Sequence, residues 1–104
     1  MQGHQGDVAI KQIQKLPQGL KKLQGTTLAY GEKTGHSHTL VADRPQVIID
    51  LLEDAEGRKY FEIKNGTATL THQEHGAVVF RPGVFVVGDE REYDVIEGVR
   101  RVQD

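Results

Sequence analysis

Four of the five histidines of this chain lie in two short motifs, "HSH" at residues 36–38 and "HQEH" at residues 72–75. Imidazole nitrogens at such close spacing are candidate ligands for a divalent transition metal. A glycine bounds each motif, Gly35 before the first and Gly76 after the second. The question is whether the two motifs form one site or are two separate polar stretches.

Strand periodicity predicts how the first motif is oriented. The run "HSHTLVA" at 36–42 is typical of a strand. In a strand, residues i and i+2 point to the same side, so His36 and His38 project together and Ser37 projects to the opposite face. A nucleophilic Ser37 activated by its neighbours is therefore not predicted.

The second motif follows the alternating run "TATLTH" at 67–72. Glu74 lies on the same side as His72 if that strand continues, while His75 faces the other way unless the chain turns at Gly76. A neighbouring pair of strands would bring His72 alongside the first motif.

Together these residues predict a metal site. The ligands would be His36, His38, His72 and His75, and Glu74 would act as a further ligand or as the general base for a metal-bound water. A nitrogen and oxygen ligand set suits Zn, Ni, Mn or Fe, and metal-assisted hydrolysis is the reaction class to test first. The alternative is that the histidines have separate surface or hydrogen-bonding roles.

Composition excludes several other classes of function. The chain has no cysteine, which excludes disulfides and thiolate metal ligands. Its formal net charge of −2 provides no field that would attract nucleic acid or an anionic membrane. No apolar run approaches the ~20 residues of a membrane span. The first residues lack the basic start and apolar run of a secretory signal, so a cytoplasmic protein is expected.

The pattern of short apolar runs and turns predicts an all-β fold. A chain of 104 residues is expected to form a single β domain over residues 1–104. About eight short strands would form a small barrel or a two-sheet sandwich. Strands are predicted within 8–13, 27–32, 36–42 and 46–54. A hairpin is predicted at 58–72 around Asn65-Gly66, and two further strands at 77–80 and 84–87 are joined by Arg81-Pro82-Gly83.

The histidine pair on one strand and the Pro-Gly turn in "FRPGVF" partly resemble the cupins. The resemblance implies a β-barrel that carries metal ligands. A cupin has a glutamate several residues after its histidine pair and a further histidine after its Pro-Gly turn. Here Asp43 stands in "HSHTLVADRP", and no histidine follows His75. The resemblance therefore does not imply cupin oxygenase or isomerase chemistry.

A second resemblance covers most of the chain. The stretches "GEKTGHSH", "HQEH", "REYD" and "RRVQD" resemble motifs of an uncharacterised family of small phage and prophage proteins. This resemblance implies a location in the host cytoplasm or the virion and implies no activity.

Two alternatives to the metal site remain open. One is a self-associating structural or virion assembly protein, a homo-oligomer whose histidines stabilise the fold or an interface. The other is a module that binds a nucleotide or a protein, with Arg81, Arg91 and Tyr93 as the first contacts. The small-molecule ligand, if there is one, is not predicted.

Overall fold

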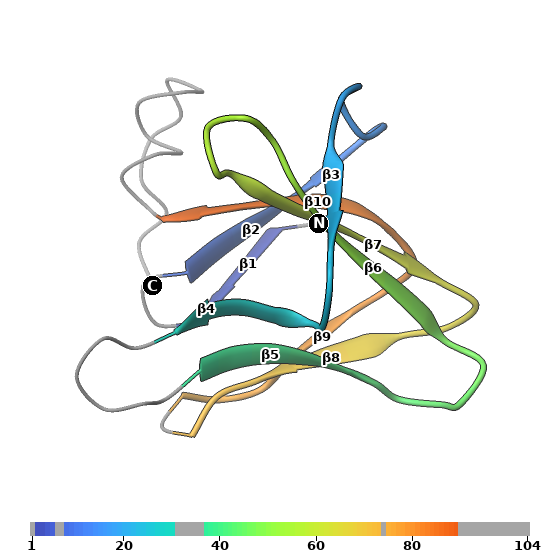
Figure 1. Cartoon of the computed structure of the whole chain (residues 1–104). Coiled ribbons are helices and arrows are strands. Elements are labelled where there is room, and N and C mark those ends of the chain that lie inside the picture. Colours follow the sequence, from blue (N-terminus) through green and yellow to red (C-terminus); the bar gives the residue numbers. More distant parts are fainter. Residues whose placement is uncertain (1, 6–7, 31–36, 74, 90–104) are drawn as a thin grey trace.

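The computed structural model describes residues 2–5, 8–30, 37–73 and 75–89, which form ten strands (Figure 1). No helix occurs in these ranges, and so none that could cross a membrane. The strands are β1 (Gln2–Gln5), β2 (Val8–Ile13), β3 (Lys21–Leu23), β4 (Thr27–Tyr30), β5 (Ser37–Ala42), β6 (Ile48–Glu53), β7 (Lys59–Lys64), β8 (Ala68–Thr71), β9 (Val78–Phe80) and β10 (Gly83–Asp89).

The strands form two antiparallel sheets. The six-stranded sheet has the order β1-β2-β10-β7-β6-β3, and the four-stranded sheet has the order β4-β5-β8-β9. Figure 1 shows the two sheets as separate layers. Within the described ranges no ladder joins the layers into a closed barrel. The predicted all-β class is confirmed, with the sandwich as its form.

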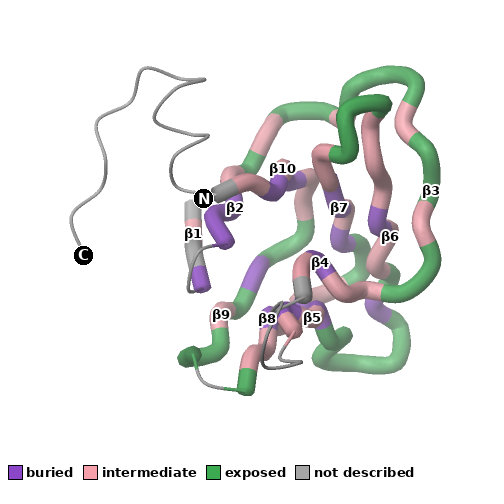
Figure 2. The backbone as a smooth tube through the Cα atoms, turned by 60° about the vertical axis from the view of Figure 1, so that its left-hand side comes forward, coloured by how far each residue is buried: buried purple, intermediate pink, exposed green. Residues whose placement is uncertain are grey.

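Period-two alternation explains which side chains fill the space between the sheets. In β7, Phe61 and Ile63 are almost fully buried, whereas Glu62 and Lys64 are on the outward face. Figure 2 shows buried positions along β7 interrupted by less buried ones, whereas β2 begins with a continuous buried stretch. Phe80 of the four-stranded sheet packs against the six-stranded sheet, with its ring centroid 5.8 Å from that of Phe61 and 5.3 Å from that of Phe85. Both sheets therefore share one aromatic core.

The predicted hairpin around Asn65-Gly66 is wrong. β7 pairs with β6 and β10, whereas β8 pairs with β5 and β9, so the two strands lie in different sheets. Asn65 and Gly66 do adopt the positive φ angles of a tight turn, 66° and 139°. The turn forms a corner between the layers, because Phe61 and Leu70 must enter the same core from opposite sides.

Two more corners lie at the same end of the sandwich. The chain passes from β9 to β10 through Arg81-Pro82, and from β5 to β6 through residues 43–47. In the second corner the Asp43 carboxylate accepts hydrogen bonds from the hydroxyls of Thr67 at 2.5 Å and Thr69 at 2.7 Å. These hydroxyls lower the pKa of Asp43, and the charge of Arg44 lowers it further.

We expect Gly66→Ala to destabilise the fold more than Gly57→Ala. Both glycines have positive φ, 139° and 87°, but a Cβ on Gly66 would lie 2.7 Å from Cγ2 of Val47, and a Cβ on Gly57 would meet nothing within 4 Å. Overpacking of this kind costs about 1–3 kcal/mol, in addition to the backbone strain that alanine would meet at each positive φ, which is larger at 139°. Urea denaturation measures the difference, and equal losses for the two variants would contradict the packing at this corner.

The lowered pKa of Asp43 predicts a pH-dependent effect of Asp43→Asn. A carboxylate with a depressed folded-state pKa stabilises the fold above its unfolded pKa of about 3.9, and this contribution is lost as pH falls through the folded value. The variant should therefore have a lower Tm than the native protein at pH 7, and the gap should close in strong acid. A gap that stays constant over this range would show that the charge of Asp43 contributes nothing.

Candidate functional site

His38 points into the sandwich near one end of the four-stranded sheet. It lies on the same side of β5 as Leu40, and both residues are buried, His38 with only 8% exposure. Ser37 and Thr39 lie on the opposite, outward side, where their hydroxyl oxygens are 3.1 Å apart. The predicted orientation of Ser37 away from His38 is confirmed.

The pairing of β5 with β8 brings the two histidine motifs together. Thr39 is the partner of Thr71 in this antiparallel pair. His38, which precedes Thr39, therefore lies beside His72, which comes directly after Thr71. Their ring centroids are 4.3 Å apart. His36 and Glu74, the other two predicted residues of these motifs, lie outside the described residues.

His75 joins the same cluster because the second strand does not continue. β8 ends at Thr71, and the chain turns through residues 72–77 before β9. The His75 ring centroid lies 4.7 Å from that of His72 and 6.4 Å from that of His38. Strand parity alone would have separated His75 from His72. The histidine cluster therefore contains three described members, His38, His72 and His75.

The buried amide of Gln5 holds His38 in place. Gln5 belongs to β1 of the six-stranded sheet, is 2% exposed and reaches across to the four-stranded sheet. Its Nε2 donates to the carbonyl oxygens of Leu70 at 3.0 Å and Gly76 at 2.8 Å. Its Oε1 lies 2.9 Å from Nδ1 of His38. One side chain thus joins both sheets and the loop that carries His75.

This network fixes the tautomer of His38. Carbonyl oxygens can only accept, so the amide nitrogen of Gln5 must face Leu70 and Gly76, and Oε1 must face His38. An amide oxygen also only accepts, so Nδ1 of His38 carries the proton. The lone pair of the neutral ring is then on Nε2, the atom with which this imidazole can ligate a metal or accept a proton.

His72 has the opposite arrangement. The backbone N–H of His75 donates to Nδ1 of His72 at 3.3 Å, which places the proton of a neutral His72 on Nε2. His72 is half-buried and His75 is exposed, so the cluster runs from the interior to the surface. No three described His, Asp or Glu side chains converge on one metal position as they stand.

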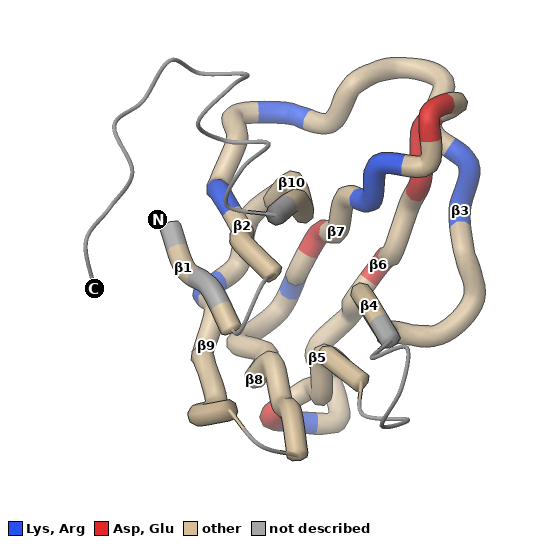
Figure 3. Tube along the Cα trace, turned by 90° about the vertical axis from the view of Figure 1, so that its left-hand side faces the viewer, with Lys and Arg blue, Asp and Glu red and all other residues tan. Residues whose placement is uncertain are grey.

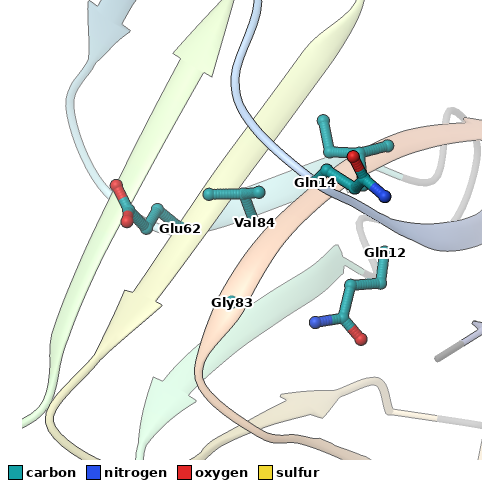
Figure 4. Close-up of a pocket in the computed structure, with 6 residues that line it drawn as sticks. Gln12, Gln14, Glu62, Gly83 and Val84 are labelled. Atoms are coloured by element: carbon teal, nitrogen blue, oxygen red, sulfur yellow. The ribbon is translucent and has the colours of Figure 1, made fainter.

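A separate groove lies on the six-stranded sheet (Figure 4). It has a volume of about 540 Å³ and opens widely to solvent. Arg81 is not part of its lining, and Arg91 and Tyr93 lie outside the described residues. The groove is lined by Gln12, Ile13, Gln14, Glu62, Gly83 and Val84 and so contains none of the predicted site residues.

Residues 4–90 match the family model for DUF8820, a domain of unknown function. The chain belongs to this family. No curated protein and no solved structure matches the chain. The DUF8820 match includes Gln5, His38, His72 and His75, so the whole described cluster lies within the domain. The resemblances to phage proteins and cupins stay predictions.

Sequence reasoning missed Gln5. It stands in the polar stretch "GHQG", where nothing in the local pattern distinguishes it from a surface residue. Its partners Leu70 and Gly76 are 65 and 71 residues away in the sequence. Only a prediction of which strands lie next to each other across the two sheets could have identified it.

We expect Gln5→Leu to destabilise the protein by on the order of 3 kcal/mol, because several buried polar partners lose a hydrogen bond and each loss costs about 1–3 kcal/mol. Gln73→Leu is the matched control. Gln73 is exposed and only accepts from the backbone N–H of Ser37 at 3.0 Å, so its loss should cost within about 0.5 kcal/mol. Urea denaturation measures both, and a Gln5 variant as stable as the control would contradict the role of this amide.

Proposed function

We propose that this domain binds a divalent transition metal ion of the Zn²⁺ type at the histidine cluster. The observation that carries the proposal is the close grouping of three imidazoles, with His38 held by Gln5 in the tautomer whose lone pair is on Nε2. His36, from the first motif, would complete the ligand set predicted from the sequence.

The contact between Gln5 and His38 supports this proposal because it has the form of an outer-shell interaction. Metal-ligating histidines almost always donate their second ring N–H to a carboxylate, a carbonyl or water, which fixes the ring and raises its basicity. The amide oxygen of Gln5 is such a partner, and the bond is buried. His38 would therefore be the preorganised ligand of the site.

The spacing of the rings also supports it. Imidazoles that share one tetrahedral ion, with metal–nitrogen bonds of about 2.0 Å, have ring centroids roughly 5 Å apart. The three described centroid distances, 4.3, 4.7 and 6.4 Å, lie on both sides of that value. Rotations of the His72 and His75 side chains, without movement of a strand, would bring their nitrogens toward one ion.

Binding through Nε2 of His72 would require its proton to move to Nδ1, with loss of the bond from the His75 backbone. That bond is exposed and 3.3 Å long, and a hydrogen bond of this kind contributes about 1 kcal/mol at most. Zn²⁺ binding in zinc-finger peptides, whose ligands include thiolates, has apparent values of about 10–16 kcal/mol, so even a much weaker imidazole site can offset this loss. The rearrangement is therefore no obstacle to binding.

The donor set indicates which ions to test. With no cysteine in the chain, thiolate ligands are excluded and the cluster offers imidazole nitrogens, which suit Zn²⁺ and Ni²⁺ better than Mg²⁺ or Ca²⁺. Hydrolysis at this metal would need a water-bearing coordination position and a base, the role that the sequence assigns to Glu74.

Isothermal titration calorimetry with ZnCl₂ on untagged protein tests the proposal. We expect stoichiometric binding at pH 7.5 and weaker binding in acid, because imidazole ligates a metal only in its neutral form. His38→Ala and His75→Ala should each weaken the affinity at least about tenfold. His4→Ala, which removes the histidine outside both motifs, should change it little.

The proposal fails if the native protein takes up no stoichiometric Zn²⁺ or Ni²⁺. It also fails if His38→Ala and His75→Ala bind these ions as tightly as the native protein. A weakening by His38→Ala alone would mean that the loop histidine does not share the site.

A further inference from the structure

The strand β1 is short and lies at the edge of the six-stranded sheet. Within the described ranges its ladder joins it to β2 alone. Figure 3 shows β1 beside β2, with β9 of the other sheet nearby. Its sequence, QGHQ, contains no apolar side chain that could anchor it in the core. Segments with few buried apolar contacts are the first to open in a folded protein, so polar contacts must decide how firmly β1 is held.

The described side-chain hydrogen bonds of Gln5 tie β1 to all three parts of the histidine cluster. Its Oε1 meets the ring of His38 directly. Its Nε2 donates to the carbonyl oxygens of Leu70 and Gly76. Leu70 lies two positions before His72, and Gly76 follows directly after the loop histidine of the cluster. The attachment of β1 and the arrangement of the imidazoles therefore depend on the same bonds.

An ion at the cluster would strengthen two of these bonds. A cation on Nε2 of His38 withdraws electron density from the ring, which makes its Nδ1–H a stronger donor to Gln5. An ion that fixes His75 also restricts the backbone at Gly76. The carbonyl that Gln5 contacts there at 2.8 Å then loses less conformational freedom when the bond forms.

We propose that β1 is a strap whose docking is linked to occupancy of the metal site. An ion at the cluster tightens the strap on the four-stranded sheet, and release of the strap weakens the binding of the ion. The inference rests on the proposed metal site and adds to it a means of regulation, since any event that displaces β1 would loosen the ion without touching a ligand. Linkage is reciprocal, so one factor describes both directions.

Gly3 offers a way to displace the strap while every bond of Gln5 keeps its partner. A Cβ on Gly3 would lie 3.3 Å from Cζ of Phe80 and 3.4 Å from Cγ1 of Val78, both on β9. Gly3→Val adds further methyl groups there and should press β1 away from β9, while valine itself suits the pairing with β2. Gly57→Ala is the matched control, because it strains a turn between β6 and β7 that carries neither the strap nor a histidine.

Amide hydrogen exchange on the untagged full chain, measured by NMR at pH 7.5 with and without saturating ZnCl₂, tests the linkage. Exchange in Gln2–Gln5 should slow at least about fivefold on addition of Zn²⁺. Exchange in Lys21–Leu23, the other edge strand of the same sheet, should stay unchanged, because fraying there breaks no bond to the cluster. The slowing should persist in His4→Ala, since the ion is not bound by the strap's own histidine.

Isothermal titration calorimetry with ZnCl₂ tests the reverse direction. Gly3→Val should weaken the Zn²⁺ affinity at least about fivefold, although it removes no ligand, and Gly57→Ala should leave the affinity unchanged.

Zn²⁺ that binds stoichiometrically but leaves exchange in β1 unchanged would overturn the linkage while the metal site stands. A native chain that takes up no Zn²⁺ would remove both. The linkage also fails if the slowing disappears in His4→Ala, or if Gly57→Ala weakens binding as much as Gly3→Val. Faster exchange of β1 in Gly3→Val together with native Zn²⁺ affinity would overturn it as well.

Discussion

The buried amide of Gln5 is the contact on which the arrangement of the histidine end depends. Both of its N–H groups go to backbone carbonyls of the four-stranded sheet and its loop, and its oxygen faces Nδ1 of His38. A buried amide that makes all three bonds is stabilising, while each bond lost leaves a partner unsatisfied. The same three bonds therefore close the sandwich at β1, anchor the loop before β9 and fix the proton on His38.

The two ends of the four-stranded sheet differ in structure: one holds the corners between the layers, and the other holds the histidine cluster. One end contains the corners where the chain crosses between layers, and it is held by Asp43 with its two threonine hydroxyls and by the tight turn at Gly66. The other end includes the turn after β8, which carries His75. A histidine cluster at that end combines one rigid member on a strand, His38, with His75 on a loop.

Alternation was enough to predict most of the strands and which residues of β7 face the core, because burial on one side of a sheet imposes a period of two. It also predicted that His38 and His72 could lie alongside each other. It did not predict the short strands β1 and β3. It failed at Asn65-Gly66, because the local turn geometry is the same whether the next strand stays in the sheet or crosses to the other one. It left the position of His75 open, because the end of β8 depends on the loop, and it missed Gln5, whose partners are distant in the sequence.

The central claim is that Gln5 holds His38 with its proton on Nδ1 and its lone pair on Nε2, ready to ligate a metal. Long-range ¹H–¹⁵N correlation spectra of the histidine rings measure this directly. The account predicts a protonated Nδ1 in His38 of the metal-free native protein, a shift confined to Nε2 of that ring when Zn²⁺ is added, and loss of the tautomer preference in Gln5→Leu. A His38 ring protonated on Nε2, or averaging between tautomers in the native protein, would contradict it.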